Sequence, residues 1–582
     1  MFRRNKFKAD DVRGVPLCMA QFKLVFHATR VPILDKDRTD IHPAYGNEHF
    51  AVVSRGKFYT VSFMSPDGRM LSTEEIWAML VLIDAQSNSA QDVEHAGWGV
   101  LTTDPRDVWA ENYKMLLAAD AKNPDELRRL HTAAFLVCLD SNNPVDDAEF
   151  TRALWHSLNP RDRFFDKSIQ LIAFSNGRMG FNGEHSLTDG TTTGRICRDA
   201  ILAVENNPEV ERLEAITSMS ENAEKIIAAS SLPHPSLIDV RLDDEIRIRM
   251  NNALNLFDSE AAAHDVYVLK FHHFGKNRLK KYKCSPDAFV QMSFQLAHFR
   301  MWGRCAATYE SASTRKYETG RTEVARGVSH ASMAWIDAID HAGMNHLGAA
   351  ERAELLRRAI GIHSRTTALA CDGQGMDRHL LGLRLICREQ GIEMPAIFTD
   401  PAYRVSSQHW TLSTSQVSDP VFAAYGWGEV VSDGYGLAYM ILDDFIHVNV
   451  CSKGRRSQEM GKRIEMALLD MQRVLDEAER ERAGREAEVE EEVEKWLEKE
   501  EKKYKDAEEE WRREIERITE ENLAKNAKNI DKERVAHFSG YSVDFEQVDV
   551  DAAFGLSKED ERRRKSTTRC GRQGSRGSCT VS

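Results

Sequence analysis

Several features are absent from the 582-residue sequence, and each absence excludes a class of protein. No apolar run approaches the roughly 20 residues that a membrane-spanning helix needs. The ten cysteines are scattered without CxxC or other metal-ligand spacing, which is typical of reduced thiols in a cytosolic protein and predicts no metal site. The segment Met1–Lys8 is basic, but Asp10 and Asp11 follow directly, so neither a signal peptide nor a transit peptide is predicted. We expect a cytoplasmic protein.

The net charge of −13 is unevenly distributed. The stretch Asp476–Glu520 contains 20 acidic and 11 basic residues, so most of the excess negative charge lies there. Its Leu497, Tyr504, Trp511 and Ile518 are seven residues apart, but the companion heptad positions are half polar. This pattern fits either a solvated single helix or a weak coiled coil. The rest of the chain is nearly neutral, so no nucleic-acid partner is expected.

Helical and strand patterns alternate along the first part of the chain. Residues 49–63 predict a hairpin with its turn near Arg55-Gly56. Helical patterns cover 72–85 and 105–119, and residues 133–138 predict a short buried strand. This alternation indicates an α/β protein.

The stretch Phe181–Asp189 carries the first candidate for chemistry. An apolar strand pattern over 168–174 and a turn over 175–178 precede it, so His185 leaves the end of a strand. Asp189 follows four residues later, close enough to orient the imidazole. A histidine held by a carboxylate can take up a proton near neutral pH. By itself this pattern also fits a structural histidine.

Two further polar segments follow in the second half. Phe274–Lys283 predicts a glycine-bearing loop with five cationic side chains, followed by a helix that Ser285 caps. Such a cluster suits either a phosphate-bearing ligand or a solvated basic turn. The hydroxyl-rich strand pattern Thr308–Arg315 fits either a solvent-facing strand or the polar wall of a ligand site.

Seven motifs occur in the order seen in the carnitine/choline acyltransferase family, which the chain resembles from about Gly14 to Leu475. The motifs are Glu184-His185-Ser186 with Asp189, Ser285-Pro-Asp-Ala-Phe289, Thr308-Tyr-Glu-Ser-Ala-Ser313, Gly320-Arg-Thr322, Asp377-Arg-His-Leu-Leu-Gly-Leu383, Leu412-Ser-Thr-Ser-Gln416 and Asp433-Gly-Tyr-Gly436.

The resemblance implies a mechanism. It implies that His185 is the general base, which takes the proton from the CoA thiol or from the carnitine hydroxyl, and that Asp189 orients it. Ser415 resembles the hydroxyl that stabilises the tetrahedral oxyanion. Attack is direct, without an acyl-enzyme. No permanently bound cofactor and no metal are implied, because CoA or acetyl-CoA is a co-substrate.

The resemblance also implies binding residues. Lys276 and Lys280 match lysines that meet the 3′-phosphate of CoA, and Asp287 and Gln416 match other positions of the CoA site. The residues that match the carnitine site are Tyr309, Ser311, Thr322, Arg378 and Trp427.

Two implications concern selectivity. Choline has no carboxylate, so Arg378 and Thr322 favour carnitine as acceptor. Tyr425 stands where members of the family that accept longer acyl chains have glycine, so we expect an acyl pocket that admits little more than acetyl or propionyl.

The chain departs from the family pattern at three places. Its Pro-Leu-Cys-Met motif begins at Pro16, more than a hundred residues earlier than is usual, which predicts a truncated N-terminal part. Ser364 follows His363 where an arginine is expected, which alters one CoA contact. The third departure is the C-terminal extension.

We therefore expect an α/β fold of two related domains with mixed sheets and flanking helices, followed by a charged helical extension. The expected limits are 1–235 for an N-terminal domain that carries the catalytic histidine, 236–475 for a domain that binds CoA and carnitine, 476–535 for a charged helix or weak coiled coil, and 536–582 for a disordered basic tail.

The last four residues are Cys579-Thr-Val-Ser582, preceded by a basic run and a second thiol at Cys570. This ending suits prenylation of Cys579 with weak tethering to a membrane. Four-residue motifs also occur by chance, so an unmodified tail is the other interpretation.

The favoured function is reversible transfer of an acetyl group between CoA and carnitine by a cytoplasmic monomer. Its expected partners are the two small-molecule substrates. The alternatives are a medium-chain carnitine acyltransferase, a choline acyltransferase, or a truncated and catalytically impaired scaffold protein.

Overall fold

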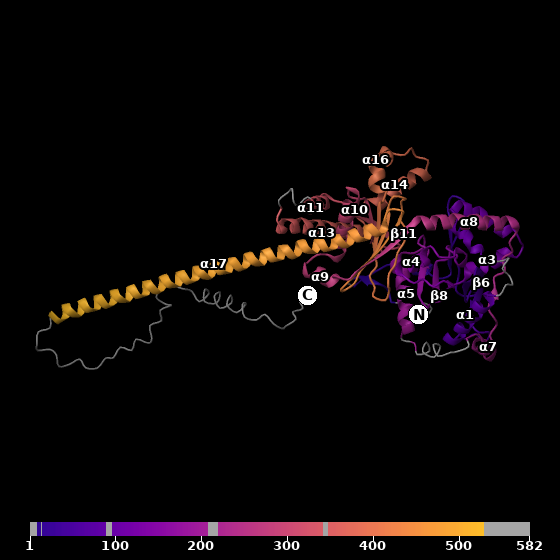
Figure 1. Cartoon of the computed structure of the whole chain (residues 1–582), viewed down its shortest axis with the longest axis horizontal. Coiled ribbons are helices and arrows are strands. Elements are labelled where there is room, and N and C mark those ends of the chain that lie inside the picture. Colours follow the sequence, from indigo (N-terminus) through magenta and orange to yellow (C-terminus); the bar gives the residue numbers. More distant parts are fainter. Residues whose placement is uncertain are drawn as a thin grey trace. The chain divides into compact units, whose positions relative to one another are not determined.

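The computed structural model describes residues 8–528 with the exceptions of 13, 89–95, 206, 208–218 and 341–346 (Figure 1). The chain divides into two compact units, residues 1–485 and residues 486–582. The prenylation candidate Cys579 and the predicted tail 536–582 lie outside the described residues. None of the helices in the described ranges combines the length and the apolar character that a membrane crossing requires.

Six strands form the first sheet of unit 1, in the order β10–β6–β5–β7–β8–β9. The pairs β5/β7 and β7/β8 are parallel, and the other neighbours are antiparallel. The hairpin predicted over 49–63 is confirmed by β5 and β6, and the strand and turn predicted before His185 are confirmed by β8 and β9. The strands are β5 (His49–Ser54), β6 (Lys57–Ser62), β7 (Leu136–Asp140), β8 (Ile169–Phe174), β9 (Met179–Gly183) and β10 (Ser236–Leu237).

The second sheet repeats this succession of parallel and antiparallel pairs. Its order is β11–β16–β15–β14–β12–β13, and β15/β14 and β14/β12 are the parallel pairs. The α/β fold with two related halves and mixed sheets is therefore confirmed. The strands are β11 (His264–Phe271), β12 (Thr308–Ser313), β13 (Thr322–Arg326), β14 (Leu412–Gln416), β15 (Tyr435–Ile441) and β16 (Ile446–Lys453).

Helices flank both sheets (Figure 1). Beside the first sheet are α1 (Thr73–Ser87), α2 (Arg106–Ala118), α3 (Asn123–Thr132), α4 (Asp147–Trp155), α5 (Gly190–Glu205), α7 (Met219–Ala229), α8 (Asp244–Ala263) and the 3-10 helices η2 (Ala20–Leu24), η4 (Trp98–Thr103) and η5 (Pro160–Asp162). With the second sheet go α9 (Lys276–Lys281), α10 (Pro286–Trp302), α11 (His330–Asp340), α13 (Ala349–Cys371), α14 (Asp377–Glu389), α15 (Ala396–Thr399), α16 (Pro401–Ser407) and the start of α17 (Ser457–Lys528). Two short ribbons are β1 (Asp11–Val12) with β2 (Val15–Pro16) and β3 (Ala28–Val31) with β4 (Arg38–Ile41).

The first sheet is buried on both faces. Successive side chains of a strand point to opposite faces, so Phe50 and Val52 of β5 pack in one core and Ala51 and Val53 pack in another. The chain just after β10 and the first half of α8 belong to the second of these cores. The predicted domain boundary after residue 235 thus lies among elements that pack on the first sheet.

The lysine-rich segment was predicted to be a loop, and this prediction is wrong because part of it forms helix α9. The start of α9 is held by tertiary hydrogen bonds: the backbone N–H of Lys276 donates to the carbonyl of Leu442 at 2.8 Å, and that of Asn277 donates to the carbonyl of Asp443 at 2.9 Å. Gly275 is needed for this approach, since a Cβ there would lie 2.5 Å from the Leu442 carbonyl oxygen. The N-cap predicted at Ser285 is confirmed by α10.

The first turns of α17 belong to the core of the second sheet. Met460, Ile464, Met471 and Leu475 recur at helical spacing and are fully buried there. Residues 486–528 of the same helix belong to unit 2 and confirm that the acidic extension is helical.

Candidate active site

A hydrogen-bonded turn holds His185 just beyond the end of β9. The carboxylate of Glu184 accepts hydrogen bonds from the backbone N–H groups of Ser186, at 3.1 Å, and Leu187, at 3.2 Å. It also accepts from the Ser186 hydroxyl at 2.6 Å and from Arg30 at 3.1 Å. One acidic side chain therefore satisfies the donors of this turn, and it leaves the His185 side chain 77% exposed.

The predicted histidine–carboxylate pair is brought together. His185 Nδ1 lies 3.9 Å from Asp189 Oδ1, which is just longer than a hydrogen bond. Asp189 is itself anchored, because Gln21 Nε2 donates to its Oδ2 at 2.7 Å and Gln21 Oε1 accepts from its backbone N–H at 2.8 Å. A carboxylate fixed in this way can hold the imidazole in one orientation as it takes up a proton.

Arg321 is the residue of this site that the sequence reasoning missed. Its guanidinium donates to Asp189 Oδ1 from Nε at 3.2 Å and from Nη2 at 2.7 Å. It also donates to the carbonyl oxygens of His185 and Ser186, each at 2.8 Å. The signal lay in the Gly320-Arg-Thr322 motif: a Cβ on residue 320 would lie 2.1 Å from the Thr314 carbonyl oxygen, so only glycine allows the turn that presents Arg321.

Three of the residues matched to carnitine binding form one cluster. Arg378 Nη2 donates to Tyr309 Oη at 2.7 Å and to Thr322 Oγ1 at 3.3 Å, and the two hydroxyls lie 3.2 Å apart. Ser311 is two residues from Tyr309 on β12 and so faces the same side of the sheet. A guanidinium with two hydroxyls is a donor set that suits a carboxylate.

The first turn of α14 positions Arg378. Asp377 accepts two hydrogen bonds from Arg326, at 3.0 and 2.6 Å, and the backbone N–H of Arg378 donates to the Glu323 carboxylate at 3.3 Å. The helix comes this close because residue 375 is glycine, where a Cβ would lie 2.3 Å from Glu323 Cγ.

The predicted oxyanion residue Ser415 is tied to the predicted acyl-pocket residue Tyr425. Tyr425 Oη donates to the carbonyl oxygen of Ser415 on β14 and lies 3.2 Å from that of Tyr439 on β15. Burial raises the pKa of the Tyr425 phenol, which stays neutral. The rings of Tyr425 and Trp427 have centroids 5.7 Å apart. The bulk of Tyr425 is thus fixed beside β14.

Both lysines matched to CoA lie on α9, four residues apart and so on one face of the helix. Lys276 Nζ makes an ion pair with Asp443 Oδ1 at 2.6 Å, whereas Lys280 is exposed. This short helix therefore carries one paired ammonium group at its start and a second one, in its last turn, that faces solvent.

Gln416, the other residue matched to CoA on β14, is exposed and lines a cavity of about 540 Å³. Its Nε2 donates to Ser418 at 2.6 Å. Arg195 and Arg198 from α5 also line this cavity, and an ion pair at 2.9 Å joins Arg198 to Asp419. Both basic and acidic side chains therefore line the cavity.

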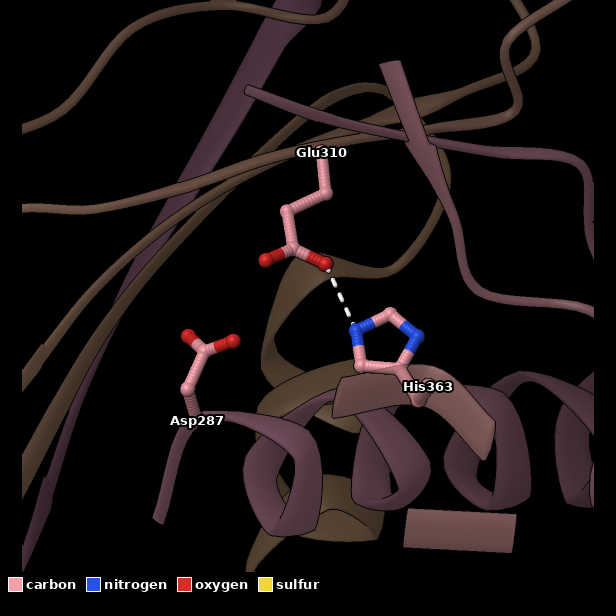
Figure 2. A group of neighbouring side chains, drawn as sticks. All are labelled: Asp287, Glu310 and His363. Atoms are coloured by element: carbon pink, nitrogen blue, oxygen red, sulfur yellow. Dashed lines mark hydrogen bonds and ion pairs between the residues drawn. The ribbon is translucent and has the colours of Figure 1, made fainter. Parts of the chain in front are cut away.

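Asp287, also matched to CoA, is half-buried and lies in a cluster with the buried side chains of Glu310 and His363 (Figure 2). His363 Nε2 lies 2.7 Å from Glu310 Oε2, and Tyr439 donates to Asp287 Oδ1 at 2.6 Å. Burial, together with the charge of Asp287, raises the pKa of Glu310 to about 7 against the opposing hydrogen bond and charge of His363. Burial alone would lower the pKa of His363, but the hydrogen bond and charge of Glu310 raise it. The pair therefore shares a proton.

The same cluster has the ligand types of a metal site, which the sequence did not predict. One ligand atom from each of the three residues lies within 4.8 Å of the others. The Glu310–His363 hydrogen bond already uses the imidazole nitrogen that faces the carboxylates, so the arrangement fits a proton-sharing network without an ion.

Comparison with known proteins gives the family. Residues 1–468 match the family model described as choline/carnitine O-acyltransferase. Carnitine O-acetyltransferase, mitochondrial, of Saccharomyces cerevisiae is 34% identical over 454 residues, a match that covers 77% of this chain and 65% of that protein. Carnitine O-acetyltransferase of Homo sapiens is 32% identical over 494 residues, covering 82% of this chain and 75% of that protein.

A relative named for a longer acyl chain is equally similar. Carnitine O-palmitoyltransferase 2, mitochondrial, of Homo sapiens is 32% identical over 461 residues, covering 79% of this chain and 67% of that protein. Among solved structures, a wax ester synthase/diacylglycerol acyltransferase from Marinobacter aquaeolei VT8 matches 53% of this chain and 72% of its own at 11% identity, with a TM-score of 0.25, too low to support a conclusion. By sequence, the chain belongs to the choline/carnitine O-acyltransferase family.

Proposed function

We propose that the chain transfers an acyl group between CoA and carnitine, with His185 as general base. His185 takes the proton of the carnitine hydroxyl, and the oxygen attacks the thioester carbonyl. The tetrahedral intermediate then loses the thiolate as the C–S bond breaks, and His185 returns the proton to sulfur. A positioned base contributes about 10²- to 10⁴-fold. The Ser415 hydroxyl is the proposed oxyanion donor, which contributes about 3 kcal/mol.

The observation that carries the choice of carnitine is the cluster of Tyr309, Thr322 and Arg378. Arg378 Nη2 is within 3.3 Å of both hydroxyls, so three donors converge on one place. Carnitine has a carboxylate that this set can bind, whereas choline has none. An arginine held beside two hydroxyls in this way would have no carboxylate to bind on a choline substrate.

We propose acetyl as the preferred acyl group. The relatives are divided between names with acetyl and names with palmitoyl at nearly the same identity, so overall similarity does not decide the chain length. The support is Tyr425, whose phenol is hydrogen-bonded to carbonyl oxygens of β14 and β15 and whose position is matched by resemblance to a glycine in members that accept longer acyl chains.

The test is turnover of acyl-CoA by the full chain, followed through release of free thiol. Acetyl-, propionyl-, octanoyl- and palmitoyl-CoA are compared with carnitine and with choline as acceptors. We expect acetyl-CoA with carnitine to give the highest kcat/KM. A preference for octanoyl-CoA would contradict the acetyl proposal, and a preference for choline would contradict the role of Arg378.

The base is tested with His185→Ala. We expect kcat to fall by about 10²- to 10⁴-fold while CoA binding, measured by calorimetry, persists. The matched control is His234→Ala, which removes another exposed histidine and should leave turnover unchanged. Substantial residual activity in His185→Ala would remove the proposed mechanism.

A further inference from the structure

The helix of unit 2 carries a row of exposed large apolar side chains that acyl transfer does not use. These residues are between 41% and 76% exposed, and the two tryptophans are 60% and 67% exposed. They belong to α17, labelled in Figure 1. The residues are Val489, Val493, Trp496, Leu497, Tyr504, Trp511, Ile515 and Ile518.

The row contains four large apolar residues in addition to the four that are seven residues apart in the sequence. At 3.6 residues per turn, the eight residues fall within an arc of about 100°, and Ala507 falls in the same arc. Glu500 is the acidic residue near the middle of the arc, and it makes an ion pair with Lys503 at 2.5 Å. The helix therefore has one apolar face along about eight turns.

Exposed faces of this kind mark interaction sites. A solvated single helix gains nothing from two tryptophans and a tyrosine in one row, and contiguous exposed apolar surface is uncommon on soluble monomers. The apolar arc has the width of a face that packs against another helix. The helical spacing and the length of the apolar face thus favour another helix as the partner that packs on it.

The charges along the helix indicate which partner packs on this face and in which orientation. Residues 486–501 contain nine acidic and two basic residues, whereas residues 502–528 contain eight of each. Two copies in parallel would place one strongly acidic segment beside the other. Two copies in antiparallel orientation place each acidic segment beside the balanced segment, which lowers the repulsion.

We propose that residues 486–528 pair with the same segment of a second copy of this chain, in antiparallel orientation, with the centre of the pair between Lys503 and Tyr504. In this register Trp496 lies opposite Trp511 of the second copy, and Val489 lies opposite Ile518. Each copy contributes the same two contacts, so the interface closes on itself as a symmetric dimer.

The flanking charges agree with this register. Glu494 comes within one residue of the level of Arg512 of the second copy on one side of the apolar face, and Glu492 comes within two residues of the level of Arg517 on the other. Each arginine lies to one side of the face, and among the described residues their ion pairs run along their own helix, Arg512 with Glu508 at 3.5 Å and Arg517 with Glu514 at 2.6 Å. Exposed ion pairs of this kind contribute little free energy. On association the two arginines can therefore pair with glutamates of the second copy, either instead or in addition.

A membrane surface fits this helix less well than a second copy. Helices that lie on membranes combine an apolar face with a polar face rich in lysine and arginine. Here residues 486–528 contain 17 acidic and 10 basic residues, so the polar face would be repelled by anionic lipid. On this proposal the chain is a dimer formed through unit 2, in place of the monomer expected from sequence.

The first experiment measures the mass of the full chain by sedimentation equilibrium between 1 and 100 μM. We expect a dimer. Trp496→Glu combined with Trp511→Glu should give a monomer and raise the dissociation constant at least 100-fold. The matched control adds two glutamates away from the apolar face, as Ala487→Glu with Ala524→Glu, and should remain dimeric. Helix content by circular dichroism should be the same in both variants.

Orientation is tested by photocrosslinking from a benzophenone amino acid placed at Trp511. Crosslinked peptides that contain Trp496 of the second copy support the antiparallel pair, and crosslinks to residues 511–513 overturn it. A wild-type monomer at 100 μM, or a dimer that persists in the double tryptophan variant, also overturns it. So does a monomer that binds phosphatidylcholine vesicles through the same face. We expect equal acyl-transfer activity in all variants. Failure of the dimer would therefore be distinguishable from failure of the proposed function.

Discussion

Arg321 and Asp189 form an ion pair that joins the two halves of the candidate site. Arg321 precedes β13 of the second sheet, Asp189 follows β9 of the first, and 132 residues separate them. The guanidinium also binds the carbonyl oxygen of His185, so one side chain holds both the carboxylate and the backbone of the proposed base. The position of His185 therefore depends on the packing of the two sheets.

We expect Arg321→Met to reduce kcat about 10- to 100-fold with a smaller change in KM for acetyl-CoA, because the substitution releases Asp189 and the His185 turn without touching the CoA site. Asp189 would then act on the imidazole without a compensating cation, which favours the protonated and inactive base. The acid limb of the pH–activity profile should move to higher pH. Steady-state kinetics between pH 6 and 9 measure both effects.

The control for this variant is Arg321→Lys, which keeps a cation near Asp189 but loses the bidentate geometry. It should recover part of kcat and most of the wild-type pH profile. A profile that is unchanged in Arg321→Met would show that Arg321 serves folding alone.

Tyr425→Gly should widen the acyl pocket. Removing the ring leaves space beside β14, so we expect the ratio of kcat/KM for octanoyl-CoA to that for acetyl-CoA to rise at least about 10-fold. Tyr425→Phe keeps the ring and removes only the hydroxyl, with its hydrogen bonds to the carbonyl oxygens of Ser415 and Tyr439. If the phenylalanine variant changes the ratio as much as the glycine variant does, the hydrogen bond and not the volume sets the chain length.

Lys280→Ala tests the predicted contact with the 3′-phosphate. Lys280 is exposed on α9, so its loss should not affect folding. We expect KM for acetyl-CoA to rise about 10-fold, the effect of one charge-assisted contact, and KM for acetyl-dephospho-CoA, which lacks this phosphate, to stay the same. Equal rises for both substrates would place the lysine elsewhere on CoA.

The sequence predicted the features that depend on neighbours along the chain. The turn before His185, the spacing of His185 and Asp189, and the cap at Ser285 are local, and the structure contains all three. Helix α9 was missed because its first turn depends on carbonyl groups of the turn between β15 and β16, more than 160 residues away.

The candidate site was only partly predictable for the same reason. Tyr309, Thr322 and Arg378 were named through resemblance, and the packing of α14 on β13, which pairs with β12, brings them within hydrogen-bonding distance. Gln21 carried no pattern, and the motif that contains Arg321 did not indicate Asp189 as its partner. Their roles exist only once the two sheets are packed, which a one-dimensional pattern does not encode.

The pair of Glu310 and His363 should make stability depend on pH (Figure 2). The pKa of Glu310 is about 7 when folded and near 4.5 when unfolded, and the pKa of His363 is also raised by folding. The folded chain therefore binds more protons than the unfolded chain between these values. By linkage, the stability from this pair is present at low pH and is lost as pH rises through 7.

Glu310→Gln removes this dependence, because the amide does not titrate and keeps a hydrogen bond to His363. We expect the free energy of unfolding of the wild type to fall between pH 5 and 8, relative to that of the variant, by roughly 3 kcal/mol, the value of a pKa shift of this size. Urea titrations at the two pH values measure the difference. Equal pH dependence in both proteins would mean that Glu310 is already ionised at pH 5, so that the cluster holds an ion pair whose carboxylate does not take up a proton on folding.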